Sequence, residues 1–169
     1  FDGESDEKTI TVSDTGIGMN DKDLEENLGT IARSGTKSFL SKMTGDAKRD
    51  SNLIGQFGVG FYSCFMVADK VEVVSRLAGE EKAYRWSSDG KGEFIIEDAE
   101  RDTPGTTVKL FLNDDGKEYA SRWRIENVIK KYSDHIPFPI YLEVDETGYE
   151  GEGDDKKEKK EHKVEQINA

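Results

Sequence analysis

Residues 8–19, KTITVSDTGIGM, decide the fold of this chain. The first half of this stretch alternates between aliphatic and polar residues, which predicts a β-strand over residues 8–13 that ends at Asp14. Glycines follow at positions 16 and 18, so the chain is expected to turn sharply after the aspartate. Asn20 or Asp21 then caps a helix. A strand, a glycine turn and a capped helix therefore open the fold.

The helices are predicted from apolar residues at helical spacing. Leu24, Leu28 and Ile31 lie at i, i+4 and i+7 after the cap. Ser34-Gly35 interrupts this pattern, and a short second helix is expected around residues 39–43. Residues 61–68 are apolar nearly all round, which predicts a buried helix. A last helix carries apolar residues at 125, 128, 129 and 132 and ends before Pro137.

Strands are predicted in the second half of the chain by alternation around residues 71–73, 84–86, 94–96 and 108–112. Short turn signals separate these four segments, which is typical of an antiparallel meander. One more strand is expected over residues 140–144. Helices placed before and after a run of strands predict an α+β fold, a two-layer sandwich of a mostly antiparallel twisted sheet with helices on one face, and not a parallel Rossmann sheet.

The composition fits one soluble domain with a charged tail. Of the 169 residues 36% are charged, compared with about a quarter in average proteins, and the formal net charge is −12. A broadly acidic surface repels nucleic acid and anionic membranes, so neither is an expected partner. The single cysteine, Cys64, cannot form an internal disulfide, which fits a reducing compartment. Residues 146–163 are mostly Asp, Glu, Lys and Gly, and we expect residues 146–169 to form a flexible linker.

The aspartate and glycines of Asp14-Thr15-Gly16-Ile17-Gly18-Met19 suggest a binding site for a base. A carboxylate at a strand end can accept a hydrogen bond from an exocyclic amine such as that of adenine. The glycines allow a close approach of the backbone to a flat base and leave room for bridging water. The alternative is a glycine turn that only joins a strand to a helix.

A second glycine segment, residues 55–60 (GQFGVG), precedes the predicted helix at Phe61. Glycines there can turn several N–H groups toward a phosphate, and a helix N-terminus adds positive potential. The spacing Gly-x-x-Gly-x-Gly matches neither the dinucleotide fingerprint nor the phosphate loop that ends in Gly-Lys-Ser/Thr. A hinge loop without a ligand is the alternative.

Two further segments carry polar groups suited to the same ligand. Residues 27–36 (NLGTIARSGT) offer an amide, hydroxyls and Arg33, a candidate phosphate partner whose alternative is a solvated surface charge. Gly105-Thr106-Thr107 opens a predicted strand, where a threonine hydroxyl can hold water or the edge of a base. Alone, that segment is only a turn into a strand.

Together these segments resemble one family, the heat-shock protein 90 chaperones, within the ATPase superfamily that also contains DNA gyrase and histidine kinases. The resemblance covers residues 9–144 and is most specific in 27–36, 55–68 and 132–142 (YSDHIPFPIYL). It implies a Bergerat-type fold, in which residues 1–145 form an N-terminal ATP-binding domain without its first strand and helix. Residues 146–169 would lead to a further domain.

The resemblance also implies residue roles. Asp14 and Thr106, with water near Gly18, would select adenine, and Met19 would pack on the base. Asn27 would lie beside the ribose and phosphates, and Arg33 near the terminal phosphate. Residues 29–60 would form a mobile lid. The nucleotide-binding residues implied are Asp14, Gly18, Met19, Asn27, Leu28, Arg33, Ser34, Gly35, Gly58, Val59, Gly60, Phe61 and Thr106.

For hydrolysis the resemblance implies groups outside this chain. In the family, the Glu that activates water and the Asn that binds magnesium lie on a helix well upstream of the adenine-binding Asp. Only 13 residues precede Asp14 here, so both groups are expected upstream of Phe1. No catalytic residue or metal ligand is therefore assigned within the chain, and Mg²⁺ would bind through the phosphates of ATP or ADP in the intact protein. The chain alone is expected to bind nucleotide poorly and to hydrolyse almost none.

The intact protein, by the same resemblance, would be an ATP-driven stress-response chaperone. It would pair with a second protomer in a homodimer and act on unfolded client proteins in the cytoplasm, with the mitochondrial matrix as the alternative compartment. A non-catalytic module that only docks partners or inhibitors is the rival class, and nucleotide titration separates the two. A histidine-kinase ATP-binding domain is disfavoured by residues 27–36 and 132–142.

Overall fold

A computed structural model describes residues 8–29, 60–150 and 157–169. These residues fall into two compact units, one of Thr9–Lys117 and one that includes Glu118–Ala169. Each unit has a sheet of its own, with five strands in the first and two in the second. In the described ranges, no helix is both long and apolar enough to cross a bilayer.

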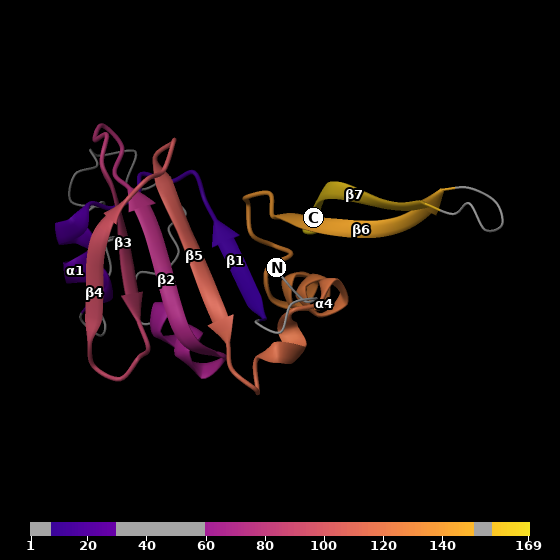
Figure 1. Ribbon diagram of the computed structural model, residues 1–169, viewed down its shortest axis with the longest axis horizontal. Helices are drawn as coiled ribbons and strands as arrows, with labels where there is room; N and C mark the ends of the chain where they lie inside the picture. Colours follow the sequence, from indigo (N-terminus) through magenta and orange to yellow (C-terminus); the bar gives the residue numbers. More distant parts are fainter. Residues whose placement is uncertain (1–7, 30–59, 151–156) are drawn as a thin grey trace. The chain divides into compact units, whose positions relative to one another are not determined.

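The sheet of the first unit contains every strand that the sequence predicts there. Its strands are β1 (Thr9–Ser13), β2 (Ala68–Arg76), β3 (Ala83–Ser88), β4 (Phe94–Ala99) and β5 (Gly105–Leu112). They lie in the order β1-β5-β2-β3-β4, and each neighbouring pair is antiparallel (Figure 1). The predicted meander is right for β2, β3 and β4. It is wrong for β5, which returns to lie between β1 and β2 instead of beside β4.

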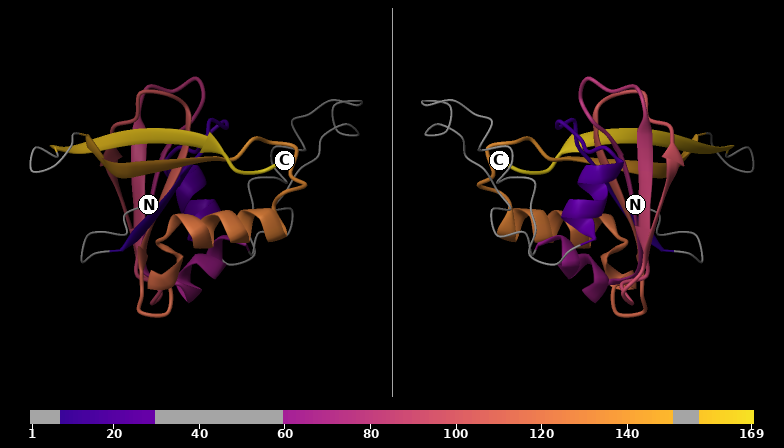
Figure 2. Two further views of the ribbon diagram at one scale, coloured as in Figure 1. Left: turned by 90° about the vertical axis from the view of Figure 1, so that its right-hand side faces the viewer. Right: turned by 90° about the vertical axis from the view of Figure 1, so that its left-hand side faces the viewer.

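One face of this sheet carries the core. Val71 and Val73 of β2 and Trp86 of β3 point to it and are almost fully buried. Helix α1 (Asp21–Leu28) covers them with Leu24 and Leu28. Figure 2 shows α1 and the short helix η1 (Phe61–Met66) on the same side of the sheet. This arrangement confirms the predicted α+β sandwich with helices on one face of a mostly antiparallel sheet.

The predicted buried helix over residues 61–68 is wrong in type and in burial. The structure has a 3₁₀ helix that ends at Met66, and Ala68 already begins β2. None of the residues of η1 is fully buried, and Met66 is 76% exposed. The aromatic rings of Phe61 and Phe65 are partly buried and pack against the core. This short 3₁₀ helix connects the preceding segment to β2. It packs only part of its surface against the core, so several of its apolar side chains remain partly or largely exposed.

Helix α1 begins where the sequence predicts it, because Asn20 caps it. The Asn20 side chain accepts a hydrogen bond from the Asp23 N–H at 3.0 Å, and the Asp23 carboxylate accepts one from the Asn20 N–H at 3.2 Å. This reciprocal pair is a capping box. The predicted continuation to Ile31 and the short helix around residues 39–43 lie outside the described residues.

We expect Asn20→Ala to lower the free energy of unfolding by about 1 kcal/mol, because the Asp23 N–H in the first turn loses the side-chain oxygen that accepts from it. Urea denaturation of the purified chain measures this difference. Lys22→Ala, at an exposed position of the same helix, is the matched control and should change the value by less than about 0.5 kcal/mol. Equal losses in the two variants would contradict the capping role.

The second unit places helix α4 (Arg122–Tyr132) against a hairpin of β6 (Tyr141–Glu150) and β7 (Lys157–Gln166). Ser121 caps the helix through its side chain, and the helix ends before Pro137 as predicted. Ile125 and Ile129 pack on a small core of Leu142, Val144 and Ile167. A short 3₁₀ helix, η2 (Lys117–Tyr119), precedes α4.

The structure differs from the expected linker. Residues 146–150 continue β6, and β7 pairs with it in a regular antiparallel register that joins Val144 to Lys163 and Tyr141 to Gln166. The charged composition of these residues did not predict the hairpin. The strands of a hairpin satisfy each other's backbone N–H and C=O groups by pairing, and little apolar area is needed away from the small core of Leu142, Val144 and Ile167. The expectation that residues 146–169 lead toward a further domain stays a prediction.

Candidate functional site

Asp14, directly after β1, is held in a fixed orientation by the backbone of β5. Its N–H donates to the Thr106 carbonyl oxygen at 2.9 Å. Its carboxylate oxygen Oδ1 accepts from the N–H of Gly16 at 2.9 Å and from the N–H of Thr106 at 3.2 Å. Within the part of the chain that the structure describes, Oδ2 has no hydrogen-bond partner, and the residue is exposed. The site therefore presents an oriented carboxylate oxygen that can accept from a ligand.

Arg101 fixes the backbone around this aspartate. Its guanidinium donates to the Asp14 carbonyl oxygen at 2.8 Å and also contacts the Thr103 carbonyl oxygen. No motif in the sequence pointed to this residue. A charged side chain in a polar turn between strands carries no periodicity, so only the spatial return of β5 beside β1 could reveal its role.

The glycine turn after Asp14 is required by the packing of the protein itself. Gly18 has φ +69°, and a Cβ placed there would lie 1.8 Å from the Arg76 carbonyl oxygen. The turn is also tied to the end of β2 by the Ala78 N–H, which donates to the Ile17 carbonyl oxygen at 2.7 Å. Close contact with β2 is thus a sufficient reason for glycine at position 18. The predicted approach to a base and a bridging water near Gly18 stays a prediction.

Thr106 and Met19 meet at a buried serine of β2. The Ser75 hydroxyl lies 2.8 Å from the Thr106 hydroxyl and accepts from the Met19 N–H at 2.8 Å. Ser75 itself has no exposed surface. Ser75 was not among the predicted site residues, although the sequence carries a signal for it. Val71, Val73 and Ser75 alternate on the buried face of β2, and a polar residue at such a position implies a hydrogen-bond partner.

Helix α1 adds two of the predicted residues to this group. Asn27 is half-buried, and its amide lies 3.9 Å from the Met19 sulfur. Leu28 is 8% exposed and belongs to the core under the sheet face. The structure therefore brings together, through a continuous set of contacts, the predicted residues Asp14, Gly18, Met19, Asn27, Leu28 and Thr106.

The end of the glycine loop lies close to this helix. The Tyr62 hydroxyl donates to the Leu28 carbonyl oxygen at 2.7 Å, and burial raises the pKa of Tyr62, so the donor stays protonated. The ring of Phe61 packs edge-on against Trp86 at 5.4 Å between centroids. Gly60 has φ −61°, a conformation open to any residue, and η1 is a 3₁₀ helix of 6 residues. The expected contribution of a helix N-terminus to phosphate binding is therefore small here.

The remaining predicted residues lie outside the described residues: Arg33, Ser34, Gly35, Gly58 and Val59. Phe1 also lies outside them, and the expectation that the magnesium-binding Asn of the family lies upstream of Phe1 stays a prediction.

The described residues contain no cluster of three or more His, Cys, Asp or Glu side chains that could hold a metal ion. Burial raises the pKa of the Cys64 thiol, so this lone cysteine is mostly protonated at neutral pH. Neither finding identifies a catalytic or metal-binding group in the described part of the chain.

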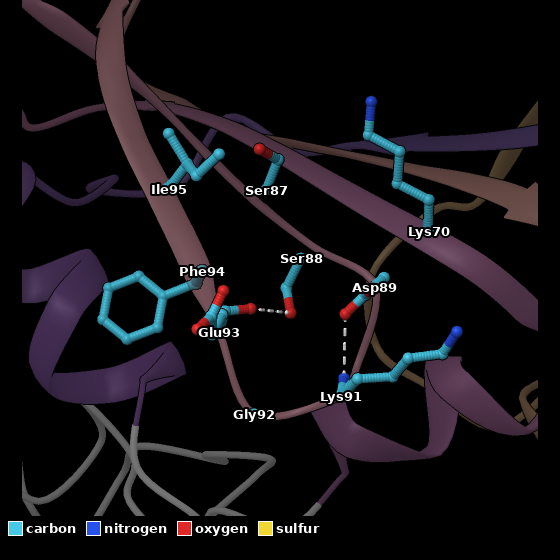
Figure 3. A pocket seen from close by; sticks show the side chains of 9 residues that line it. All are labelled: Lys70, Ser87, Ser88, Asp89, Lys91, Gly92, Glu93, Phe94 and Ile95. Carbon is cyan, nitrogen blue, oxygen red and sulfur yellow. Dashed lines mark hydrogen bonds between the residues drawn. The ribbon is translucent and has the colours of Figure 1, made fainter.

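A groove at the β3–β4 turn has a volume of about 670 Å³ (Figure 3). None of the predicted site residues lines it. Its polar groups are partly satisfied within the turn, since the Ser88 hydroxyl donates to the Glu93 carbonyl oxygen and the Lys91 N–H donates to the Asp89 carboxylate. We place the candidate site at Asp14 and not at this groove, because two backbone N–H groups orient the Asp14 carboxylate and its neighbour Thr106 joins it to the other predicted residues.

The sequence around this site matches a known family. Residues 2–115 fit the model of the histidine kinase-, DNA gyrase B- and HSP90-like ATPases. The chain belongs to this ATPase family. The matched range runs from before β1 to just beyond β5, so it contains Asp14, Thr106 and all the strands of the five-stranded sheet. Membership in this ATPase family implies nucleotide binding.

Individual relatives show which members of this ATPase family the chain is similar to. The chain is 59% identical over 169 residues to the chaperone protein HtpG of Helicobacter hepaticus, covering 100% of the chain and 27% of the relative. It is 58% identical over 165 residues to HtpG of Helicobacter pylori, covering 98% of the chain and 27% of the relative. It is 58% identical to HtpG of Wolinella succinogenes, over 97% of the chain and 25% of that protein. The chain thus spans about a quarter of the length of these relatives.

Proposed function

We propose that this chain is the adenine-nucleotide-binding domain of an ATP-dependent molecular chaperone that acts on unfolded or client proteins. One observation carries the proposal. The Asp14 carboxylate is fixed by two backbone N–H groups through Oδ1, one of them from Thr106, which leaves Oδ2 open to a ligand. The family match and the chaperone name of the relatives support the same assignment.

In this proposal the adenine amino group donates a hydrogen bond to Asp14 Oδ2. Met19, held by its N–H on Ser75, packs against the base, and Asn27 lies beside the ribose and phosphates. Arg33 and the glycine loop, with Gly58, Val59, Gly60 and Phe61, bind the phosphates. Asp14 only accepts a hydrogen bond in this scheme, so its role is recognition and not catalysis.

For the whole protein we propose ATP hydrolysis, a homodimer and a cytoplasmic location. Mg²⁺ would bind through the phosphates of the nucleotide. The described residues supply no donor set for it, so we assign no residue and no step to the metal. A non-catalytic docking module is the rival proposal, and it predicts no nucleotide binding.

Calorimetric titration with ADP tests the proposal against this rival. We expect the whole protein that carries this segment to bind ADP in the micromolar range or tighter, and to bind IDP, which has an oxygen in place of the adenine amino group, at least about tenfold more weakly. The comparison isolates the amine that Asp14 is proposed to recognise. Equal affinities for ADP and IDP would contradict recognition of the amine, and no binding of either would favour the docking module.

A further inference from the structure

Ser75 is a polar residue on the buried face near the end of β2, and the chemistry assigned so far leaves it without a role of its own. It lies on β2 directly opposite Thr106 of β5 and has no exposed surface. Its hydroxyl oxygen has three neighbours: the Met19 N–H at 2.8 Å, the Thr106 hydroxyl at 2.8 Å and the Gly105 carbonyl oxygen at 3.0 Å. A buried hydroxyl with so many neighbours constrains where each proton lies.

The number of protons settles the direction of each hydrogen bond. A serine hydroxyl has one proton to donate and two lone pairs to accept with. Met19 can only donate through its N–H, and the Gly105 carbonyl oxygen can only accept. All these contacts are satisfied together only if Ser75 donates to Gly105 and Thr106 donates to Ser75. The opposite direction would leave the lone pairs of Ser75 and Gly105 facing each other at 3.0 Å.

This direction determines what Thr106 offers to a ligand. Its hydroxyl donates its only proton inward to Ser75, so only lone pairs remain toward the site. Asp14, whose carboxylate is bonded to the N–H of the same Thr106, likewise offers an acceptor through Oδ2. Two acceptors in one site suit a group with N–H donors and disfavour a carbonyl oxygen, because lone pairs would then face lone pairs.

We propose that Ser75 is a positioning residue for base selectivity, which orients the Thr106 hydroxyl so that the site accepts a 6-aminopurine and rejects a 6-oxopurine. The inference rests on the proposed function, because it concerns the same adenine site. Ser75 does not touch the ligand. It acts through the hydroxyl of Thr106 and through the N–H of Met19.

The test measures the ratio of the affinities for ADP and IDP in the whole protein, for the parent and for Ser75→Ala. Without Ser75 the Thr106 hydroxyl is free to rotate and to donate to a 6-oxo group. We expect the ratio to fall about tenfold in Ser75→Ala and to be restored in Ser75→Thr, which keeps a hydroxyl at the same place. A general loss of stability would weaken the binding of ADP and IDP equally and would leave the ratio of their affinities unchanged.

Ser13 provides a matched control on the other face of the same sheet. Its hydroxyl lies 2.8 Å from that of Thr107, so it forms the same kind of serine–threonine pair between β1 and β5. Ser13→Ala should leave the ratio of affinities unchanged. If it lowers the ratio as much as Ser75→Ala does, the inference is wrong.

A second variant keeps the test decisive if Ser75→Ala does not fold. Thr106→Val removes the hydroxyl that faces the site, while Ser75 keeps Met19 and Gly105 as partners. The ratio should fall by a similar factor, and an unchanged ratio overturns the inference.

If the parent prefers ADP but neither variant alters that preference, only the role of Ser75 fails. If the parent binds neither nucleotide, the proposed function fails and the inference fails with it.

Discussion

Replacing Asp14 by asparagine should weaken ADP binding by about ten- to a hundredfold, since a hydrogen bond to a charged group contributes about 1.5–3 kcal/mol. Asparagine is the informative replacement because its carbonyl oxygen can still accept from the N–H groups of Gly16 and Thr106. Its amide nitrogen would then take the place of Oδ2. A donor would face the amine of the base, so both the charge and the acceptor are lost while the turn is kept.

Calorimetric titration of the whole protein measures this loss, and two other variants calibrate it. Asp14→Ala should lose ADP binding to a similar extent but should also lose stability, because two backbone N–H groups are left without their acceptor. Asp98→Asn changes an exposed carboxylate on β4 of the same sheet and should leave the affinity unaltered. An unchanged titration curve for Asp14→Asn would mean that the base is recognised elsewhere.

Gly18→Ala should lower the free energy of unfolding by about 3 kcal/mol or more. Two costs combine at this position. A residue with a Cβ is strained at φ +69°, and that Cβ would lie 1.8 Å from the Arg76 carbonyl oxygen, which is backbone and cannot rotate away. The strand end of β2 or the turn itself must therefore move, and ADP binding should be lost together with stability.

Gly79→Ala separates the two costs. Gly79 has φ +88°, but a Cβ there meets no atom within 4 Å. It should therefore show the strain alone, about 1–2 kcal/mol. Urea denaturation of the parent and the two variants gives the comparison. If Gly18→Ala costs no more than Gly79→Ala, the close packing of the turn on β2 is not a constraint on the fold.

Local patterns predicted the elements that form around Asp14. The alternation of residues 8–13 and the cap at Asn20 depend on neighbours in the sequence, and the structure has both where they were expected. The position of β5 between β1 and β2 depends instead on which strands pair, and short turns give no information about that. Val108 faces Val12 on one side and Val73 on the other, a pairing that no local pattern specifies.

The candidate site was predicted in part for the same reason. Asp14, Met19 and Thr106 were assigned from motifs and from the resemblance to the chaperone family, and the structure brings these residues together. Ser75 and Arg101 were missed because their roles arise only where β2 and β5 meet the turn after β1. The hairpin of β6 and β7 was missed because composition says little about backbone pairing.

A crystal structure of the whole protein with ADP tests the central claim most directly. We expect the amino group of adenine at about 2.8–3.0 Å from Asp14 Oδ2, with the base against Met19 and the Thr106 hydroxyl still bonded to Ser75. A nucleotide bound away from Asp14, for example in the groove at the β3–β4 turn, would contradict the account.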